Sequence, residues 1–177
     1  TIKVSNRDMC IPIDQKLGIL ASVLFEPKTN LSDTLTYDIT AWSLPYIYGL
    51  DAYALENNLK LELKDVLPFK SLELKIDKNS YGYLSKWGTI NDLKFLAEIL
   101  NHRVTVRVAE KSFEHEGVNY KPGTLFISPR GNEHLGSKLH EIIKTATTNH
   151  SPEITSIKTG SSSKGIDLGS SNFNVIT

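Results

Sequence analysis

Hydrophobic and polar positions follow two different periods in the second half of the chain. Over residues 81–108 an apolar run is followed by a stripe of apolar residues at helical spacing, and then by valines at every second position. The spacing predicts an amphipathic helix near 90–100, begun by Thr89 or Asn91, and strands near 81–86 and 104–108. A strand, a helix and a strand in so short a stretch are typical of a parallel crossover.

The same succession of patterns returns further along the chain. Residues 124–128 predict a strand, residues 133–148 a helix and residues 153–158 another strand. Two such units predict an α/β domain with three layers and a mostly parallel sheet. The glycines and serines from Thr159 onward indicate a loop or exit linker. We therefore expect one domain over residues 1–158, followed by that loop or linker over residues 159–177.

Patterns in the first half are shorter. Residues 8–13 predict a strand and residues 15–25 a helix, while residues 40–55 predict a turn and a helix interrupted near Pro45. Over residues 57–80, leucine and isoleucine alternate with lysine and glutamate, as in strands with one wet face. We expect this last segment to be an inserted β arm, either a hairpin or an addition to a sheet edge.

Large aromatic rings are concentrated in residues 38–55. Trp42, Tyr46, Tyr48 and Tyr53 lie there, whereas aromatic residues make up 8% of the whole chain. The rings either cover the sheet as part of the core or form a docking face, for which tryptophan and tyrosine are favoured. The two interpretations are compatible if a neighbouring domain of a longer chain covers the outer side of these rings.

Composition mainly excludes functions. Twenty basic and twenty acidic residues cancel, so no strong field favours nucleic acid or an anionic membrane. No apolar run approaches the roughly 18 residues of a membrane-spanning helix. The apolar neighbours of Cys10, the single cysteine, predict a buried small hydrophobe, and one cysteine fits either redox compartment. Because the chain opens on Thr1, we expect it to be a processed or excised piece.

Catalytic motifs are hard to place on this sequence. One cysteine and five scattered histidines do not compose a zinc site, and we expect surface histidines. Glu114, His115 and Glu116 form a carboxylate–imidazole cluster that we place at a solvated hairpin tip. Residues 160–165 match neither the nucleophile elbow nor the phosphate-binding loop. The residues therefore predict no catalytic group, metal or cofactor in this chain.

Three stretches resemble a known family. Residues 38–53, residues 104–113 with 123–127, and residues 165–173 are similar to segments of large bacterial zinc carboxypeptidase-like proteins of the Bacteroidetes type. In that family the segments follow the peptidase domain, in a region resembling class I glutamine amidotransferases. The resemblance implies a flavodoxin-like layered fold, a secreted or periplasmic location, and a peptidase domain of the same parent chain as partner. The zinc site it implies belongs to that peptidase domain.

Two functional hypotheses follow. The first is a non-catalytic accessory domain of a secreted zinc carboxypeptidase-like metallopeptidase, which supports the peptidase domain or shapes substrate access. The second is a small-molecule or peptide binder that uses the crevice at the carboxyl ends of parallel strands. That crevice would include the loops at residues 87–88, 110–111 and 128–131, with Arg130 as an anion contact. Trp42, Tyr46 and Tyr48 are the candidate interface residues of the first hypothesis.

Overall fold

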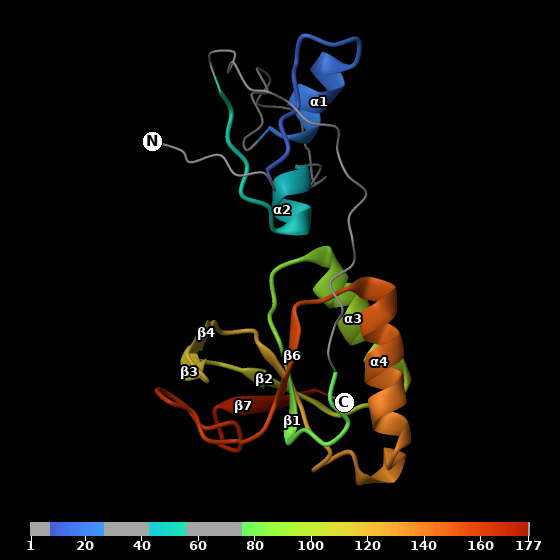
Figure 1. The fold of residues 1–177 in the computed structure, drawn as a ribbon, viewed down its shortest axis with the longest axis vertical. Helices are drawn as coiled ribbons and strands as arrows, with labels where there is room; N and C mark the ends of the chain where they lie inside the picture. The colour runs from blue at the N-terminus through green and yellow to red at the C-terminus, as the bar shows by residue number, and fades with distance from the viewer. Residues whose placement is uncertain (1–7, 27–42, 56–75, 177) are drawn as a thin grey trace, which may run out of the picture. The chain divides into compact units, whose positions relative to one another are not determined.

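The computed structural model describes residues 8–26, 43–55 and 76–176 (Figure 1). The chain divides into two compact units, Thr1–Lys70 and Ser71–Thr177, and each is described by itself below. None of the described helices has the length and apolar character needed to cross a membrane.

The first unit contains two short helices, α1 (Gly18–Leu24) and α2 (Leu44–Tyr48). Pro45 lies in the first turn of α2, where its missing amide costs no hydrogen bond. Gly49 ends α2 with a φ of 60°, and Leu50 N donates to Pro45 O at 2.8 Å. This left-handed glycine closes the helix as in many C-terminal caps. The two helices predicted in this region are thus confirmed, although both are shorter than the sequence indicated.

The second unit is built on a five-stranded sheet. Its spatial order is β6-β1-β5-β2-β7, and each of its four pairings is antiparallel. The strands are β1 (Gly82–Ser85), β2 (Val106–Ala109), β5 (Leu125–Ile127), β6 (Ile154–Ile157) and β7 (Phe173–Ile176).

The prediction of a mostly parallel, flavodoxin-like or amidotransferase-like sandwich is wrong. Both strand–helix–strand units exist, but they interleave, because β5 lies between β1 and β2, and β1 lies between β5 and β6. The two strands of each unit run in the same direction without pairing. Without β7 and the separate two-stranded sheet of residues 113–120, the strands and helices follow one another as β-α-β-β-α-β, as in a ferredoxin-like sheet. The patterns identified the strands and helices of these two units, but did not determine which strands become neighbours.

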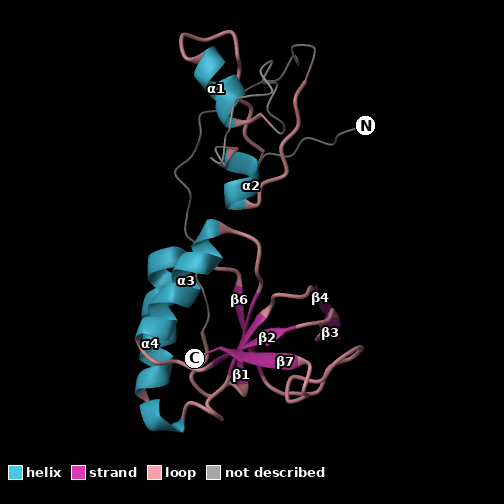
Figure 2. Cartoon of the chain, turned by 180° about the vertical axis from the view of Figure 1, so that it is seen from behind, coloured by secondary structure: helices cyan, strands magenta, loops and turns pink. Residues whose placement is uncertain are grey.

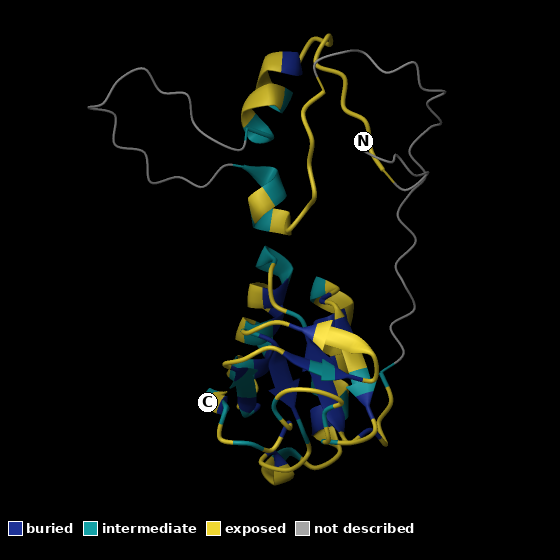
Figure 3. Ribbon diagram, turned by 90° about the vertical axis from the view of Figure 1, so that its left-hand side faces the viewer, coloured by how far each residue is buried: buried dark blue, intermediate teal, exposed yellow. Residues whose placement is uncertain are grey.

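Two helices cover one face of this sheet, as Figure 2 shows. Helix α3 (Ile90–Asn101) and helix α4 (Lys138–His150) pack against each other and against the strands. Their shared core consists of buried side chains from both layers, among them Tyr83, Phe95, Ile99, Val106, Leu125, Ile127, Ile143 and Ala146. Buried positions accordingly follow the strands and the inner helix faces (Figure 3).

The opposite face carries no described helix. A hairpin of β3 (Phe113–His115) and β4 (Val118–Tyr120), together with the loop at 159–172, covers it. The second core lies beneath them and contains Leu84, Ala109, Phe113, Tyr120, Phe126, Ile157, Leu168 and Phe173. Side chains from alternate strand positions therefore supply two separate cores.

Helix α3 begins as its sequence predicts. The Thr89 hydroxyl accepts from Asp92 N at 3.3 Å, and the Asp92 carboxylate accepts from Thr89 N at 2.8 Å. This reciprocal capping box satisfies amides that the first helical turn leaves free. In the second predicted helix the chain instead forms a 3₁₀ turn, η1 (Glu133–Leu135), and α4 starts after it.

Other local predictions have mixed outcomes. No strand forms over residues 8–13, and the hairpin tip predicted at residues 114–116 includes the last two residues of strand β3. The predicted β arm over residues 57–80 falls mostly within residues 56–75, outside the described residues. Residues 159–172 form an irregular loop with one isolated bridge between Glu114 and Lys164, and the last strand, β7, follows it.

Candidate functional site

A group of polar side chains lies where β1 ends and β6 begins. We call it the Tyr120 cluster, and it consists of Lys86, Glu116, Tyr120, Glu153 and Thr155. Because β1 and β6 are antiparallel, Lys86 comes opposite Glu153, and Lys86 N donates to Glu153 O at 3.0 Å. The Lys86 ammonium also pairs with the Glu153 carboxylate at 2.5 Å. The Lys86 and Glu153 side chains are 40% and 68% exposed, so water screens the pair and it adds little stability.

Tyr120 is the buried member of the cluster. Its ring stacks on Phe113 with centroids 5.0 Å apart. Burial raises the pKa of the Tyr120 phenol. A hydrogen bond with Thr155 and the charge of Lys86 partly oppose this rise, and the weaker effects of Glu153 and Glu116 add to it. Tyr120 therefore stays protonated at neutral pH and can donate a hydrogen bond, but it cannot act as a base.

His115 lies next to this cluster on β3. Its side chain is 1% exposed, and neither ring nitrogen has a hydrogen-bond partner in the described part of the chain. The nearest ionisable partner is Glu116, whose Oε1 lies 3.9 Å from His115 Nε2. Buried polar atoms are rarely left without a partner, so this histidine needs a physical explanation.

Trp87 adds an aromatic surface beside Lys86. It lies against Gly123, where a Cβ atom would be 3.3 Å from Trp87 Cδ1. Gly123 also has a φ of +90°, a conformation that other residues rarely adopt. The indole is 42% exposed, so part of one aromatic ring system is open to solvent at this end of the sheet.

The chemistry available to the Tyr120 cluster is hydrogen bonding and aromatic contact. Lys86 is paired with Glu153, and Tyr120 is protonated. Within residues 8–26, 43–55 and 76–176, no three His, Cys, Asp or Glu side chains come close enough to hold a metal ion. These groups can hydrogen-bond a polar ligand and offer it an aromatic face.

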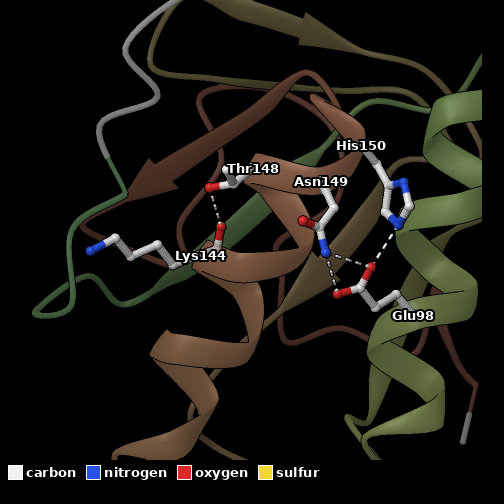
Figure 4. A network of polar contacts seen from close by, with 5 residues as sticks. All are labelled: Glu98, Lys144, Thr148, Asn149 and His150. Atoms are coloured by element: carbon white, nitrogen blue, oxygen red, sulfur yellow. Dashed lines mark hydrogen bonds and ion pairs between the residues drawn. The ribbon is translucent and has the colours of Figure 1, made fainter.

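A second polar network joins the two helices (Figure 4). Glu98 on α3 accepts hydrogen bonds from Asn149 Nδ2 at 3.1 Å, and it lies 2.6 Å from His150 Nε2. Thr148 donates to the Lys144 carbonyl at 2.9 Å, while the Lys144 ammonium points away from Glu98. The carboxylate is thus occupied by the end of α4, and the network links two helices structurally.

The predicted interface residues lie in or next to the first unit's second helix. Trp42 lies outside the described residues. Tyr46 and Tyr48 lie on α2 and are 68% and 45% exposed, and Tyr53 is exposed as well. Of the two interpretations of the aromatic segment, these three rings agree with a surface rather than with a core.

Arg130 does not join the other loops of the predicted crevice. It is exposed in the loop after β5, where its carbonyl accepts from Ser128 Oγ at 2.7 Å. Strand β5 runs antiparallel to β1 and β2. The loop at 128–131 therefore lies at the opposite end of the sheet from Trp87 and Glu110, so these loops do not form one crevice.

The candidates from the sequence differ in outcome. Cys10 is exposed, so the prediction of a buried cysteine is wrong. His115 is buried rather than solvated at a hairpin tip, and the expectation of surface histidines fails for it. Ser162 and Ser163 are tied into their loop by bonds to Ile166 O and Glu114 O, at 2.7 Å each.

The sequence prediction missed the burial of Tyr120 and His115 because it placed Glu114, His115 and Glu116 together at a solvated hairpin tip. The available signal was the pair Glu116 and Gly117, which take φ values of 50° and 78°. Two adjacent residues with positive φ form the tight turn typical of a two-residue β-hairpin. With that turn, Phe113 and His115 fall opposite Tyr120 and Val118.

No family model matches this chain, and comparison with curated proteins and with solved structures finds no significant match either.

Proposed function

We propose that this chain is a non-catalytic accessory domain of a secreted zinc carboxypeptidase-like metallopeptidase, and that it acts by docking against the peptidase domain of the same parent chain. The proposal combines the resemblance of residues 38–53 to that family with the exposure of Tyr46 and Tyr48. The amidotransferase-like fold that the resemblance implied does not enter the proposal.

The supporting observation is the apolar surface of the first unit. Helix α1 has the sequence Gly-Ile-Leu-Ala-Ser-Val-Leu, without a charged residue, and Ile19, Leu20 and Val23 are exposed on it. A helix that is apolar on more than one side is normally buried against other structure. Tyr46 and Tyr48 belong to the same unit, and exposed tyrosines are typical of interface anchors.

Binding to the peptidase domain tests the proposal directly. We expect the chain to bind the separately produced peptidase domain of its parent, and the double substitution Tyr46→Ser and Tyr48→Ser to weaken binding at least about tenfold, since buried aromatic anchors carry much of an interface's energy. Leu93→Gln, at an exposed position of α3 in the second unit, is the matched control. Isothermal titration calorimetry measures both.

Two outcomes would contradict the proposal. One is a parent sequence without a peptidase domain, and the other is unchanged binding in the double variant. Turnover of a peptide by the purified chain in the presence of zinc would contradict its non-catalytic character.

A second candidate function is binding of a small polar molecule or a peptide at the Tyr120 cluster. The observation that favours it is the half-exposed indole of Trp87 next to the Lys86–Glu153 pair. A ligand-dependent rise in melting temperature that disappears in Trp87→Ala would support this function. Absence of any such shift across a panel of peptides and sugars would count against it.

A further inference from the structure

Arg107 and Val175 lie together at one edge of the sheet, on the face that carries the second core. Arg107 pairs with Phe126 of β5 on one side and with Val175 of β7 on the other. Directly paired side chains share a face, so both residues continue the row of Phe126, a member of the second core. Phe173, on the same side of β7, is 4% exposed, whereas Val175 is 55% exposed and Arg107 is half-buried. The hairpin and loop that cover this face therefore reach Phe173 but not Val175.

The guanidinium of Arg107 has no anionic partner among the residues that the structure describes. The ion pairs of this part of the chain involve other side chains. Acidic side chains on β3, in the covering loop and after β2 have other partners: Glu114 pairs with Lys164, Asp167 accepts from Ser162 N, and Glu110 accepts from Asn174 Nδ2. A half-buried cation without an anion carries a desolvation cost, which a bound carboxylate offsets through charge-assisted hydrogen bonds.

The outer side of β7 pairs with no strand in the described part of the chain. Glu110 N donates to Asn172 O at 3.0 Å, and such hydrogen-bonded pairs alternate along an antiparallel ladder. Phe173 and Val175 therefore direct their backbone groups away from β2. Within the described ranges, the bond from Phe173 N to Ser170 O is the only backbone contact on that side. The amide and carbonyl of Val175 and the carbonyl of Phe173 remain available to a further strand.

We propose that β7 takes up an extended acidic peptide as a sixth strand of the sheet, with a carboxylate of the peptide on Arg107. In strand addition, main-chain hydrogen bonds supply affinity and alternate side chains supply specificity. A peptide residue opposite Val175 is two strand spacings, roughly 10 Å, from the backbone of Arg107. An arginine and a glutamate side chain together span this distance, and the planar guanidinium holds a carboxylate with two hydrogen bonds. The site lies at the opposite edge of the sheet from β6 and is independent of the function proposed above.

A second copy of this chain is a poorer occupant of this edge. Residues 171–177, which contain β7, include no acidic residue. Antiparallel pairing of two β7 strands would place the Arg107 side chains of both copies on one face, without an anion between them. Like charges disfavour such a pairing, whereas an acidic peptide complements Arg107.

Binding of a peptide to the whole chain tests the proposal. The probe is a short fluorescein-labelled peptide in which glutamate alternates with valine, and the control peptide has glutamine at each glutamate position. We expect fluorescence anisotropy to give at least about fivefold tighter binding of the acidic peptide, because hydrogen bonds to charged groups are the stronger ones. Equal binding of the two peptides, or no binding, would overturn the proposal.

Substitutions locate the peptide on the chain. Val175→Pro removes the outward amide without breaking a bond to β2, as edge strands allow, and should weaken binding at least about fivefold. Arg107→Gln should reduce the affinity for the acidic peptide to that for the glutamine peptide. Lys94→Gln, at an exposed position of α3, removes the same charge from the helix-covered side and should bind like the natural chain. A folded Val175→Pro or Arg107→Gln chain that binds as tightly as the natural chain would overturn the proposal.

Hydrogen exchange of the natural chain decides the question if a variant does not fold. With saturating acidic peptide, the protection of the Val175 amide should rise at least about tenfold, because the amide becomes hydrogen-bonded. The amide of Ser156, on the other edge strand β6, should not change. Protection at Ser156 instead of Val175 would overturn the proposal, and so would a dimer of the natural chain that protects Val175 without peptide.

Discussion

His150 Nε2 lies 2.6 Å from Glu98 Oε2, and this contact joins the last turn of α4 to the last turn of α3. The same carboxylate accepts from Asn149 Nδ2 at 3.1 and 3.3 Å. About a fifth of each of the His150 and Glu98 side chains is exposed, so water weakens the contact less than it would at the surface. The two helices are thus held together by polar contacts in addition to their apolar core.

Removal of the carboxylate should loosen this helix pair. We expect Glu98→Ala to lower the free energy of unfolding by about 1 kcal/mol, the usual contribution of such hydrogen bonds. Urea denaturation of both variants measures the difference. Lys144→Ala is the matched control, because Lys144 takes part only through its carbonyl, which the substitution retains. Equal stability of the two variants would contradict this role of Glu98.

Gly82 lies where β1 passes close to β5. A Cβ atom there would be 2.8 Å from Ile127 O and 2.7 Å from the Phe126 ring. Because the carbonyl belongs to a paired strand, the sheet must shift to admit a methyl group. We expect Gly82→Ala to cost about 1–3 kcal/mol in the free energy of unfolding, as overpacking usually does.

Gly88 provides the control for Gly82. No atom lies within 4 Å of a Cβ built there, so Gly88→Ala should change the free energy of unfolding by less than about 0.5 kcal/mol. Thermal and urea denaturation of the two alanine variants compare them directly. If the Gly82→Ala and Gly88→Ala variants are equally stable, strands β1 and β5 can move apart without a cost in the free energy of unfolding.

Asn132 connects two loops from inside the protein. It is 2% exposed, and its side chain accepts from Thr105 N at 2.7 Å and donates to the carbonyls of Thr105 and Ser128 at 2.9 Å. We expect Asn132→Ala to cost about 1–3 kcal/mol in the free energy of unfolding, because it leaves buried backbone groups without partners. Asn119→Ala, at an exposed position of β4, should change it little.

The sequence was sufficient for elements whose signal is local. Thr89 and Asp92 are three residues apart and satisfy each other's backbone amides, so the start of α3 depends on neighbours in the chain. The apolar stripe after Thr89 and the alternating valines up to Val108 likewise reflect one buried face each. Most elements of the second unit were therefore predictable within a few residues.

Pairing between distant strands was not predictable in the same way. A helix connecting two strands of the same direction is compatible with adjacent strands, or with a third strand between them. In this chain Leu84 pairs with Phe126 on one side and with Thr155 on the other. Strands of three or four residues carry too few side chains to encode such long-range choices in their pattern. The assumption of adjacent parallel strands led to the wrong fold and to the wrong place for Arg130.

The Tyr120 cluster depends on the same long-range pairing. Lys86 and Glu153 are 67 positions apart, and only the antiparallel β1–β6 pairing brings them together. The second core depends on the loop at 159–172 as well, because Leu168 of that loop is buried in it and Ser163 N donates to Glu114 O of β3. The composition of this Gly/Ser-rich segment alone indicates only flexibility, so no local pattern could have shown that it packs on the sheet.

Alkaline pH should destabilise the second unit through its buried tyrosines. Burial raises the pKa of Tyr120 and of Tyr83 above the ordinary value of 10.0. The folded state then holds these protons more tightly than the unfolded state does. Their contribution to stability is therefore complete below about pH 10, and is lost as pH rises through the folded-state pKa.

We expect the free energy of unfolding to fall above about pH 10, by up to about 1.4 kcal/mol per pH unit for each buried tyrosine. Tyr120→Phe keeps the ring stacked on Phe113 but removes the ionisable group, so its slope should be shallower than that of the natural chain. Tyr46→Phe, on exposed α2, should leave the slope unchanged. Urea titrations at several pH values measure the slopes, and equal slopes in all three chains would contradict a buried, protonated Tyr120.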